Sequence, residues 1–241
     1  MRTLKISREN TGYFFDSILN SYSQIFFSTH KPFAVIILVV TFYDVYAGLM
    51  GLLSVLITSI TAFALNLYKP TTANGFYGFN SLLVGLGLGI YFSFGWHLLM
   101  IVTLASLFTF FVSVSLQGVI GKYHIPYLSV PFIIALWTFI TATRSFEALG
   151  ISERGIYTLN ELYQLGGDRL IDIHEYFNSI TLPRIISTYF ISLSAILFQY
   201  SVLSGIFIAV GLLLYSRIAF SLSILGFTVA YVFYGIIGAS I

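Results

Sequence analysis

Residues 70–121, between Lys69 and Lys122, contain no Asp, Glu, Lys or Arg. A helix that crosses a bilayer needs about 20 consecutive apolar residues, so this stretch is long enough for two crossings. Further uncharged stretches cover residues 45–68, 123–143, 185–216 and 218–241. The pattern predicts an all-α integral membrane protein.

The composition leads to the same class. Hydrophobic residues make up 58% of the chain and charged residues 8%, whereas soluble domains have about 25% charged residues. A net charge of +2 gives no reason to expect a nucleic-acid partner, and the absence of cysteine excludes disulfides and thiolate metal sites. We expect a multi-pass protein of the cell (inner or plasma) membrane, surrounded by the lipid bilayer and without cofactor or metal.

Prolines, glycines and charges between the apolar stretches predict where helices end. Residues 146–183 hold six of the nine acidic residues and are expected to form a polar extramembrane connector. Asp168, Asp172, His174 and Glu175 in this connector could be a metal site, although a solvated helix face explains them better. The expected apolar helices cover residues 11–28, 33–46, about 51–68, 96–120, about 131–143, 184–198, 202–215 and 218–237.

The stretch 75–92 is apolar but contains five glycines. Glycine costs about 1 kcal/mol in a helix interior relative to alanine, so we expect a half-membrane, re-entrant helix rather than a full span. The pair Gly85 and Gly89 is also typical of close packing between helices.

A faint internal repeat divides the chain. The segment Ser23-Gln24-Ile25-Phe26-Phe27 aligns with Ser194-Ala195-Ile196-Leu197-Phe198, and each precedes a short apolar helix. Paired halves around a central site are common in transporters. The repeat predicts a first transmembrane half in residues 1–145 and a partial second half in residues 184–241.

Three motifs resemble the urea transporter family. The segment from Gly75 to Gly85 (GFYGFNSLLVG) resembles that family's first pore-helix signature, the segment from Ser23 to Phe27 its first helix, and the segment from Ile125 to Phe132 (IPYLSVPF) the motif that opens the last span of its first half. The resemblance implies an inverted-repeat fold, with five spans and one re-entrant pore helix in each half, assembled as a homotrimer. The second half, with about three spans, resembles that of a C-terminally truncated member.

The resemblance also implies site residues. Gln24 and Ser129 match positions whose polar side chains meet urea, and Phe27 and Phe79 match positions of an aromatic slot. Gly75, Gly78, Asn80 and Gly85 belong to the pore-helix motif. Ala195 stands where the family's second half usually has Gln or Glu, which is a departure from the pattern.

Each of these assignments has a structural alternative. Gln24 could bond a neighbouring helix, and Phe27 and Phe79 could serve packing, since the chain has 24 phenylalanines. Asn80 is better explained by satisfying backbone groups at a helix start than by direct contact with a solute.

Urea is small, planar and neutral, so a pore need only replace its hydrogen bonds with water. Ion-coupled carriers generally use ionised groups inside the membrane, and the candidates within apolar segments are Asp16 and Asp44. We therefore expect passive, channel-like permeation of urea and no enzymatic activity. Two alternatives stay open: a membrane scaffold or half-length subunit that needs a partner chain, and a channel for ammonia or another small amide.

Overall fold

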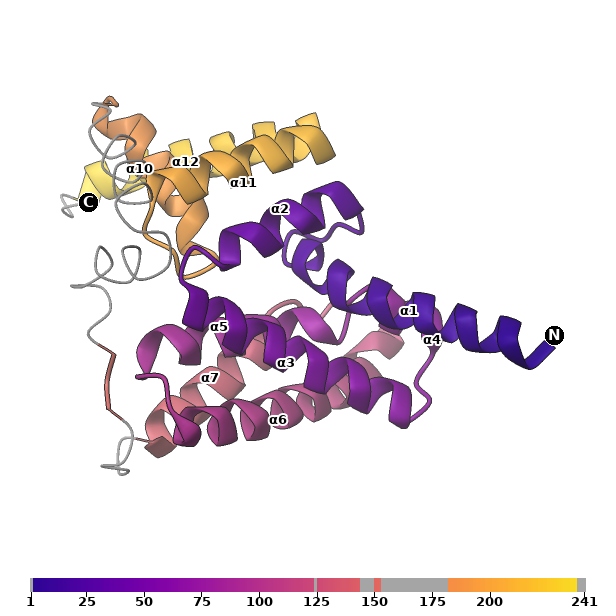
Figure 1. Cartoon of the computed structure of the whole chain (residues 1–241). Helices are drawn as coiled ribbons and strands as arrows, with labels where there is room; N and C mark the ends of the chain where they lie inside the picture. The colour runs from indigo at the N-terminus through magenta and orange to yellow at the C-terminus, as the bar shows by residue number, and fades with distance from the viewer. Residues whose placement is uncertain (1, 124, 144–149, 153–181, 238–241) are drawn as a thin grey trace, which may run out of the picture. The chain divides into compact units, whose positions relative to one another are not determined.

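A computed structural model describes residues 2–123, 125–143, 150–152 and 182–237, with side chains from residue 12 onwards (Figure 1). The chain forms two compact units, residues 1–156 and 157–241. Most of the expected connector, including Asp168, Asp172, His174 and Glu175, lies outside the described residues.

The first unit consists of helices joined by short turns, and an isolated bridge pairs Phe92 with Ile151. Residues 45–64 and 78–91 form its most extensive helix pair, which residues 96–120 and 130–143 flank. The helices are α1 (Arg2–Gln24), α2 (Lys31–Thr41), α3 (Val45–Ala64), α4 (Lys69–Ala73), α5 (Gly78–Tyr91), α6 (Trp96–Ile120) and α7 (Val130–Thr143), with a 3-10 turn at Gly121–Tyr123.

Charged side chains lie at helix ends. Among the residues whose side chains are described, Asp16 is the one acidic or basic residue inside a helix; the others, apart from histidine, begin a helix, cap one or lie in a turn. Three helices are long and apolar enough to cross a membrane, namely α3, the continuous segment Trp96–Tyr123, and Arg217–Ile237 in the second unit. The charge-free helix interiors are those expected of a membrane protein.

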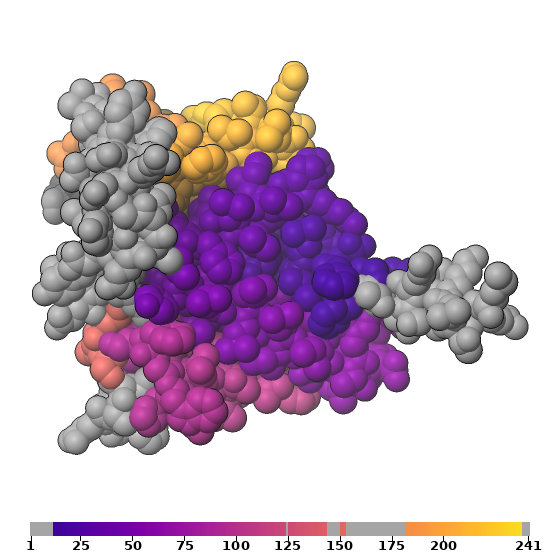
Figure 2. All heavy atoms as spheres, viewed as in Figure 1, coloured from indigo at the N-terminus to yellow at the C-terminus, as the bar shows by residue number. Residues whose placement is uncertain are grey.

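Helix α5 lies inside the first unit. Every residue from Gly78 to Gly89 is buried, while atoms of α1, α2 and α3 (indigo to purple) lie at the surface on the face drawn in Figure 2. Its 14 residues give a length of about 21 Å, less than the roughly 30 Å of a hydrocarbon core. Helix α5 is thus short and buried along all but its last two residues, and its half-membrane, re-entrant placement stays a prediction.

Glycines bring α5 against α3. A Cβ atom built on Gly85 would lie 2.5 Å from the Met50 carbonyl oxygen and 2.9 Å from the Gly51 Cα atom, and one on Gly89 would lie 2.9 Å from the Ala47 Cα atom. These contacts are with backbone, which cannot move aside. The close packing inferred for Gly85 and Gly89 is therefore observed.

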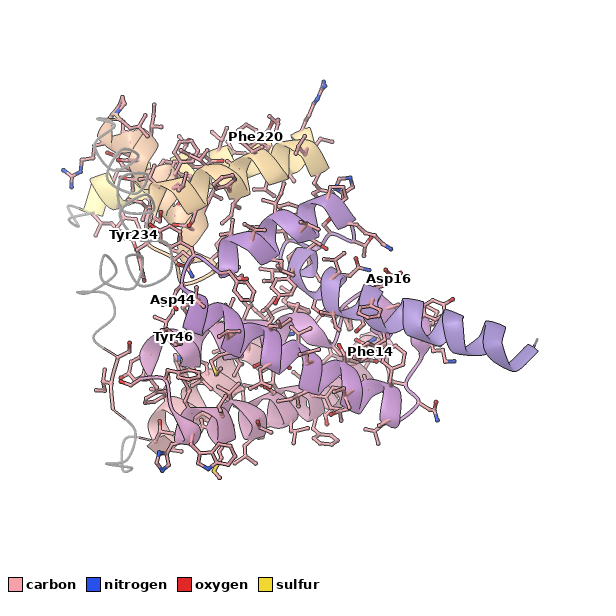
Figure 3. All side chains as sticks on the ribbon, viewed as in Figure 1. Phe14, Asp16, Asp44, Tyr46, Phe220 and Tyr234 are labelled. Atoms are coloured by element: carbon pink, nitrogen blue, oxygen red, sulfur yellow. The ribbon has the colours of Figure 1, made fainter. Side chains whose placement is uncertain are left out.

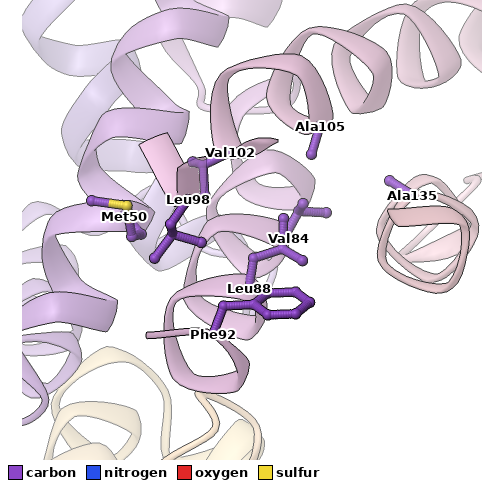
Figure 4. Close-up of a cluster of buried hydrophobic side chains, with 8 residues drawn as sticks. All are labelled: Met50, Val84, Leu88, Phe92, Leu98, Val102, Ala105 and Ala135. Atoms are coloured by element: carbon purple, nitrogen blue, oxygen red, sulfur yellow. The ribbon is translucent and has the colours of Figure 1, made fainter. Parts of the chain in front are cut away.

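A hydrophobic cluster joins four helices. Its buried side chains come from α3, α5, α6 and α7 and from the residue that follows α5 (Figure 4), and they are Met50, Val84, Leu88, Phe92, Leu98, Val102, Ala105 and Ala135. Buried hydroxyls on α6 do not interrupt the packing, because Ser106, Thr109 and Ser113 each donate to the carbonyl four residues earlier, at 2.6–2.8 Å. Such bonds satisfy polar groups within one helix.

The second unit contains α10 (Arg184–Ala195), α11 (Val202–Tyr215) and α12 (Arg217–Ile237). Gly205 of α11 lies against the backbone of Phe190 on α10, where a Cβ atom would collide with the Phe190 carbonyl group. The Tyr189 hydroxyl lies 2.8 Å from the Ser223 hydroxyl, which ties α10 to α12.

Helix limits follow the sequence closely in places and depart elsewhere. The ranges 96–120 and 202–215 are those of α6 and α11. The expected span 33–46 is shorter, since α2 ends at Thr41 and the Asp44 carboxylate accepts a 2.9 Å hydrogen bond from Ala47 N–H to cap α3. The five-span count and the inversion of the halves stay predictions.

We predict that Gly85→Ala destabilises the first unit. The added methyl group would meet backbone atoms of α3, and overpacking of this kind costs about 1–3 kcal/mol. Gly118→Ala is the matched control, because a Cβ atom at Gly118 has nothing within 4 Å. Thermal unfolding of the detergent-solubilised protein measures both; equal unfolding temperatures for the two variants would contradict the packing argument.

Candidate functional site

Helix α1 ends in a Schellman turn centred on Phe27. The Ser28 N–H donates to the Ser23 carbonyl at 3.2 Å, and the Phe27 N–H donates to the Gln24 carbonyl at 2.9 Å. Phe27 has φ 55°, the left-handed conformation that glycine usually supplies at this position. A bulky residue held there costs roughly 1–3 kcal/mol, and the Phe27 side chain is 62% exposed.

The turn between α4 and α5 is docked on α1. The Asn20 amide donates to the Ala73 carbonyl at 2.8 Å, and Gly75, at φ 75°, lies directly against the backbone of Asn20 and Ser21. Gly78 lies against the Ser21 side chain with no room for a Cβ atom. Gly75 is therefore needed both for its conformation and for this close approach.

Asn80 joins the start of α5 to the start of α7. Its Oδ1 accepts from the Phe132 N–H at 3.3 Å, and its Nδ2 donates to the Leu128 carbonyl at 3.2 Å. The side chain is fully buried. Because helix N-termini leave backbone N–H groups without partners, Asn80 acts as the cap of α7 from another helix.

This arrangement leaves the Ser129 hydroxyl without a capping role. Ser129 precedes the first residue of α7, and its carbonyl accepts from Ile133 N–H at 3.1 Å. A serine there usually accepts from the backbone two or three residues later, but the Phe132 N–H is bonded to Asn80. Within the described part of the chain, the Ser129 hydroxyl and the Gln24 amide form no hydrogen bond.

An aromatic contact fastens the same two loops together. The Tyr127 hydroxyl donates to the Phe76 carbonyl at 3.2 Å, and the two rings lie 5.0 Å apart between centroids. The Phe79 ring is 6.4 Å from that of Phe76 and is 3% exposed. Two of the three segments that suggested a family, residues 75–85 and 125–132, are thus joined to each other. The loop from Ala73 to Asn80 meets α1 at Asn20 and Ser21, just before the third segment.

The sequence matches one known family over most of its length. The sequence model of the urea transporter family matches residues 15–241. The chain belongs to the urea transporter family. This confirms the resemblance seen in the three motifs, and with its apolar helices it identifies a membrane protein of a transport family.

Relatives agree with this family over part of their length. Urea transporter 1 of Ovis aries and of Capra hircus are each 30% identical over 138 residues, and urea transporter 1 of Mus musculus is 28% identical over 138 residues. Each match covers 56% of this chain and 36% of the relative. The chain therefore matches about a third of the length of these curated relatives.

The second unit of this urea transporter family member repeats the turn after α1. Gln199 N–H donates to the Ser194 carbonyl at 3.0 Å, Phe198 N–H donates to the Ala195 carbonyl at 3.0 Å, and Phe198 has φ 60°. The segments that align in the sequence therefore end their helices in the same Schellman turn. Gln24 and Ala195 occupy equivalent positions in the two turns.

The predicted site residues fall into two groups. Asn80 holds the loop that contains Ser129, and Phe79 lies buried beside Asn80. Gln24 and Phe27 lie at the end of α1, and within the described ranges no hydrogen bond or ring contact joins them to Phe79 or Ser129. A groove of about 390 Å³ lies along α6, away from these residues, and is lined by Trp96, Leu99, Met100, Thr103 and Leu104.

The sequence did not indicate which buried polar atoms would lack a partner, and five described side chains contain one: Asn20, Tyr22, Thr58, Gln199 and Ser204. Gln199 Nε2 and Ser204 Oγ are buried and have no hydrogen-bond partner among the described residues. Gln199 follows Phe198 directly, and Ser204 is in the first turn of α11. Their unpaired state depends on tertiary packing, so periodicity and motifs carried no signal for it.

We predict that Asn80→Leu exposes the amide of Phe132 to exchange. Leucine has a similar size but removes both hydrogen bonds, which leaves the Phe132 N–H without a partner. An unpaired buried backbone group costs about 1–3 kcal/mol. Hydrogen exchange followed by mass spectrometry, on a peptide covering the start of α7, should report faster exchange. Asn74→Leu is the control, since Asn74 is exposed at the end of α4. Unchanged protection in Asn80→Leu would show that this cap is dispensable.

Proposed function

We propose that this chain provides a passive, channel-like path for urea, in which polar side chains replace hydration and aromatic rings restrict the shape of the solute. Family membership and the name of the relatives support urea as the solute. The remaining support comes from the distribution of charge and of unbonded polar groups. The proposal places the protein in the cell membrane as a homotrimer, as the family resemblance implies.

The carboxylates in the helical segments support passive permeation. Asp44 caps α3 through Ala47 N–H, and Asp16 forms an ion pair with Lys31. Both therefore have local structural partners, whereas a proton or ion relay uses carboxylates that exchange their partners during transport. A neutral solute needs no charge compensation from either group.

The polar groups that carry the proposal are the Gln24 amide and the Ser129 hydroxyl. Both are partly exposed, and neither has a hydrogen bond within the described part of the chain. The amide offers an acceptor and donors, and the hydroxyl offers both, which suits the N–H groups and carbonyl of urea. Gln24 is the last residue of α1 and Phe27 follows in the turn three residues later, so the amide and the exposed ring belong to the same helix end.

Urea flux tests this proposal. Gln24→Leu removes the hydrogen-bonding amide and Phe27→Ala removes the ring, and each should lower urea permeability of proteoliposomes by about tenfold, equivalent to 1.4 kcal/mol of lost barrier stabilisation. Ser129→Ala should lower it, and Ser129→Thr, which keeps the hydroxyl, should restore it. Stopped-flow light scattering provides the rates.

Matched controls separate a path from a general loss of structure. Gln117→Leu and Phe111→Ala change a partly exposed glutamine and an exposed phenylalanine of α6 and should leave urea flux unchanged. If liposomes that contain the wild-type protein show no urea flux, the scaffold or the partner-dependent subunit is favoured instead. Ammonia flux that exceeds urea flux and ignores Gln24→Leu would favour the ammonia channel.

A further inference from the structure

An ion pair closes the segment that contains the Phe27 turn. The Lys31 ammonium lies 2.6 Å from the Asp16 carboxylate, and Figure 3 shows Asp16 on the length of α1, beside α2. The side chains are 58% and 38% exposed, respectively. Among the side chains described from residue 12 on, Asp16 is the one acidic or basic residue inside a helix; the others, apart from histidine, lie at helix ends or in turns.

The position of this pair constrains the path of the chain. Asp16 precedes the last residue of α1, Gln24, by two turns, which is about 12 Å along the helix axis. For Lys31 to reach Asp16, residues 25–30 must run back beside α1 after the helix ends. Phe26 and Phe33 support the same return, since their ring centroids are 5.4 Å apart.

Phe27 sits within this closed segment. Its backbone is fixed on one side by the two Schellman hydrogen bonds to α1. On the other side, His30 N–H donates to Ser28 Oγ at 3.0 Å, and Lys31 is held by Asp16. A phenylalanine with positive φ persists where the surroundings over-determine the backbone, and the ion pair supplies the anchor that is most distant in sequence.

The strength of that anchor depends on its surroundings. An exposed ion pair in water contributes little to stability, but attraction between opposite charges rises as the dielectric constant falls. Because both side chains of this pair are exposed, its expected effect is to fix the path of residues 25–30 rather than to add much stability. Removing one partner releases that constraint on the turn.

We propose that Asp16 and Lys31 are positioning residues, which hold the Phe27 turn in the conformation that admits urea. The inference rests on the proposed function, because it gives the turn a role in permeation. Neither residue contacts the solute in this assignment; both act through the backbone of residues 25–30. Loss of either charge frees the turn, and restoration of an opposite-charge pair in reversed order restores it.

The test has one readout that is independent of urea. The chain has no cysteine, so Thr29→Cys, at an exposed position in the turn, gives a single site for a nitroxide spin label while Phe27 stays intact. Spectra of the labelled protein in liposomes are compared for the parent, Asp16→Asn, Lys31→Met and the charge reversal Asp16→Lys with Lys31→Asp. Lys122→Met, an exposed charge in the turn after α6, is the control.

We expect both single variants to increase label mobility and to lower urea flux about five- to tenfold, consistent with the coupling energies of residues in direct contact. The charge reversal should recover most of both, and Lys122→Met should change neither. Flux and mobility at parent values in the single variants, or a reversal that behaves like the single variants, would overturn the inference. If liposomes that contain the parent protein show no urea flux, the proposed function is wrong. The mobility of the spin label would still report whether the ion pair holds the turn.

Discussion

A break in a helix leaves backbone N–H and C=O groups that lipid cannot hydrogen-bond, and several helix ends in the described part of this chain take their partners from the protein. After α1, α3 and α10, the chain closes a Schellman turn on its own last carbonyls, with Phe27, Asn66 and Phe198 in the left-handed region. At the start of α7 the partner is the Asn80 side chain. The candidate site residues lie next to these capped helix ends. At a helix end, side chains leave the packed interior.

The placement of Asn80 depends in turn on how deeply α5 is buried. Glycine at positions 85 and 89 lets the backbone of α5 meet that of α3, and Gly75 and Gly78 let the preceding turn rest on α1. Larger side chains at these positions would push α5 outwards and carry Asn80 away from α7. The glycine-rich composition and the helix cap are thus parts of one arrangement.

The sequence predicted what local rules control. Charge-free stretches gave the membrane class, and the limits of α6 and α11 agreed with the expected ranges. The expected helix end near residue 68 was wrong by four residues, because α3 ends at Ala64 and Lys69 begins α4. The sequence did not predict contacts that join distant residues, such as Asn80 with Leu128 and Phe132 or Asp16 with Lys31, because no periodicity specifies them. Nor did it predict the positive φ of Phe27, because phenylalanine has no preference for that region and tertiary context imposes it.

The two equivalent turns separate folding from function at the end of α1. Gln24 in the first turn and Ala195 in the second are followed by the same pair of hydrogen bonds and by a phenylalanine with the same backbone conformation. A side-chain amide is therefore not required to build the turn. Glycine would adopt that conformation at lower cost than phenylalanine, so neither the Gln24 amide nor the Phe27 ring is explained by backbone geometry. What remains for both is what their side chains contact beyond the turn, and in the proposed function that contact is with urea, whose hydrogen-bonding groups a partly exposed amide can pair.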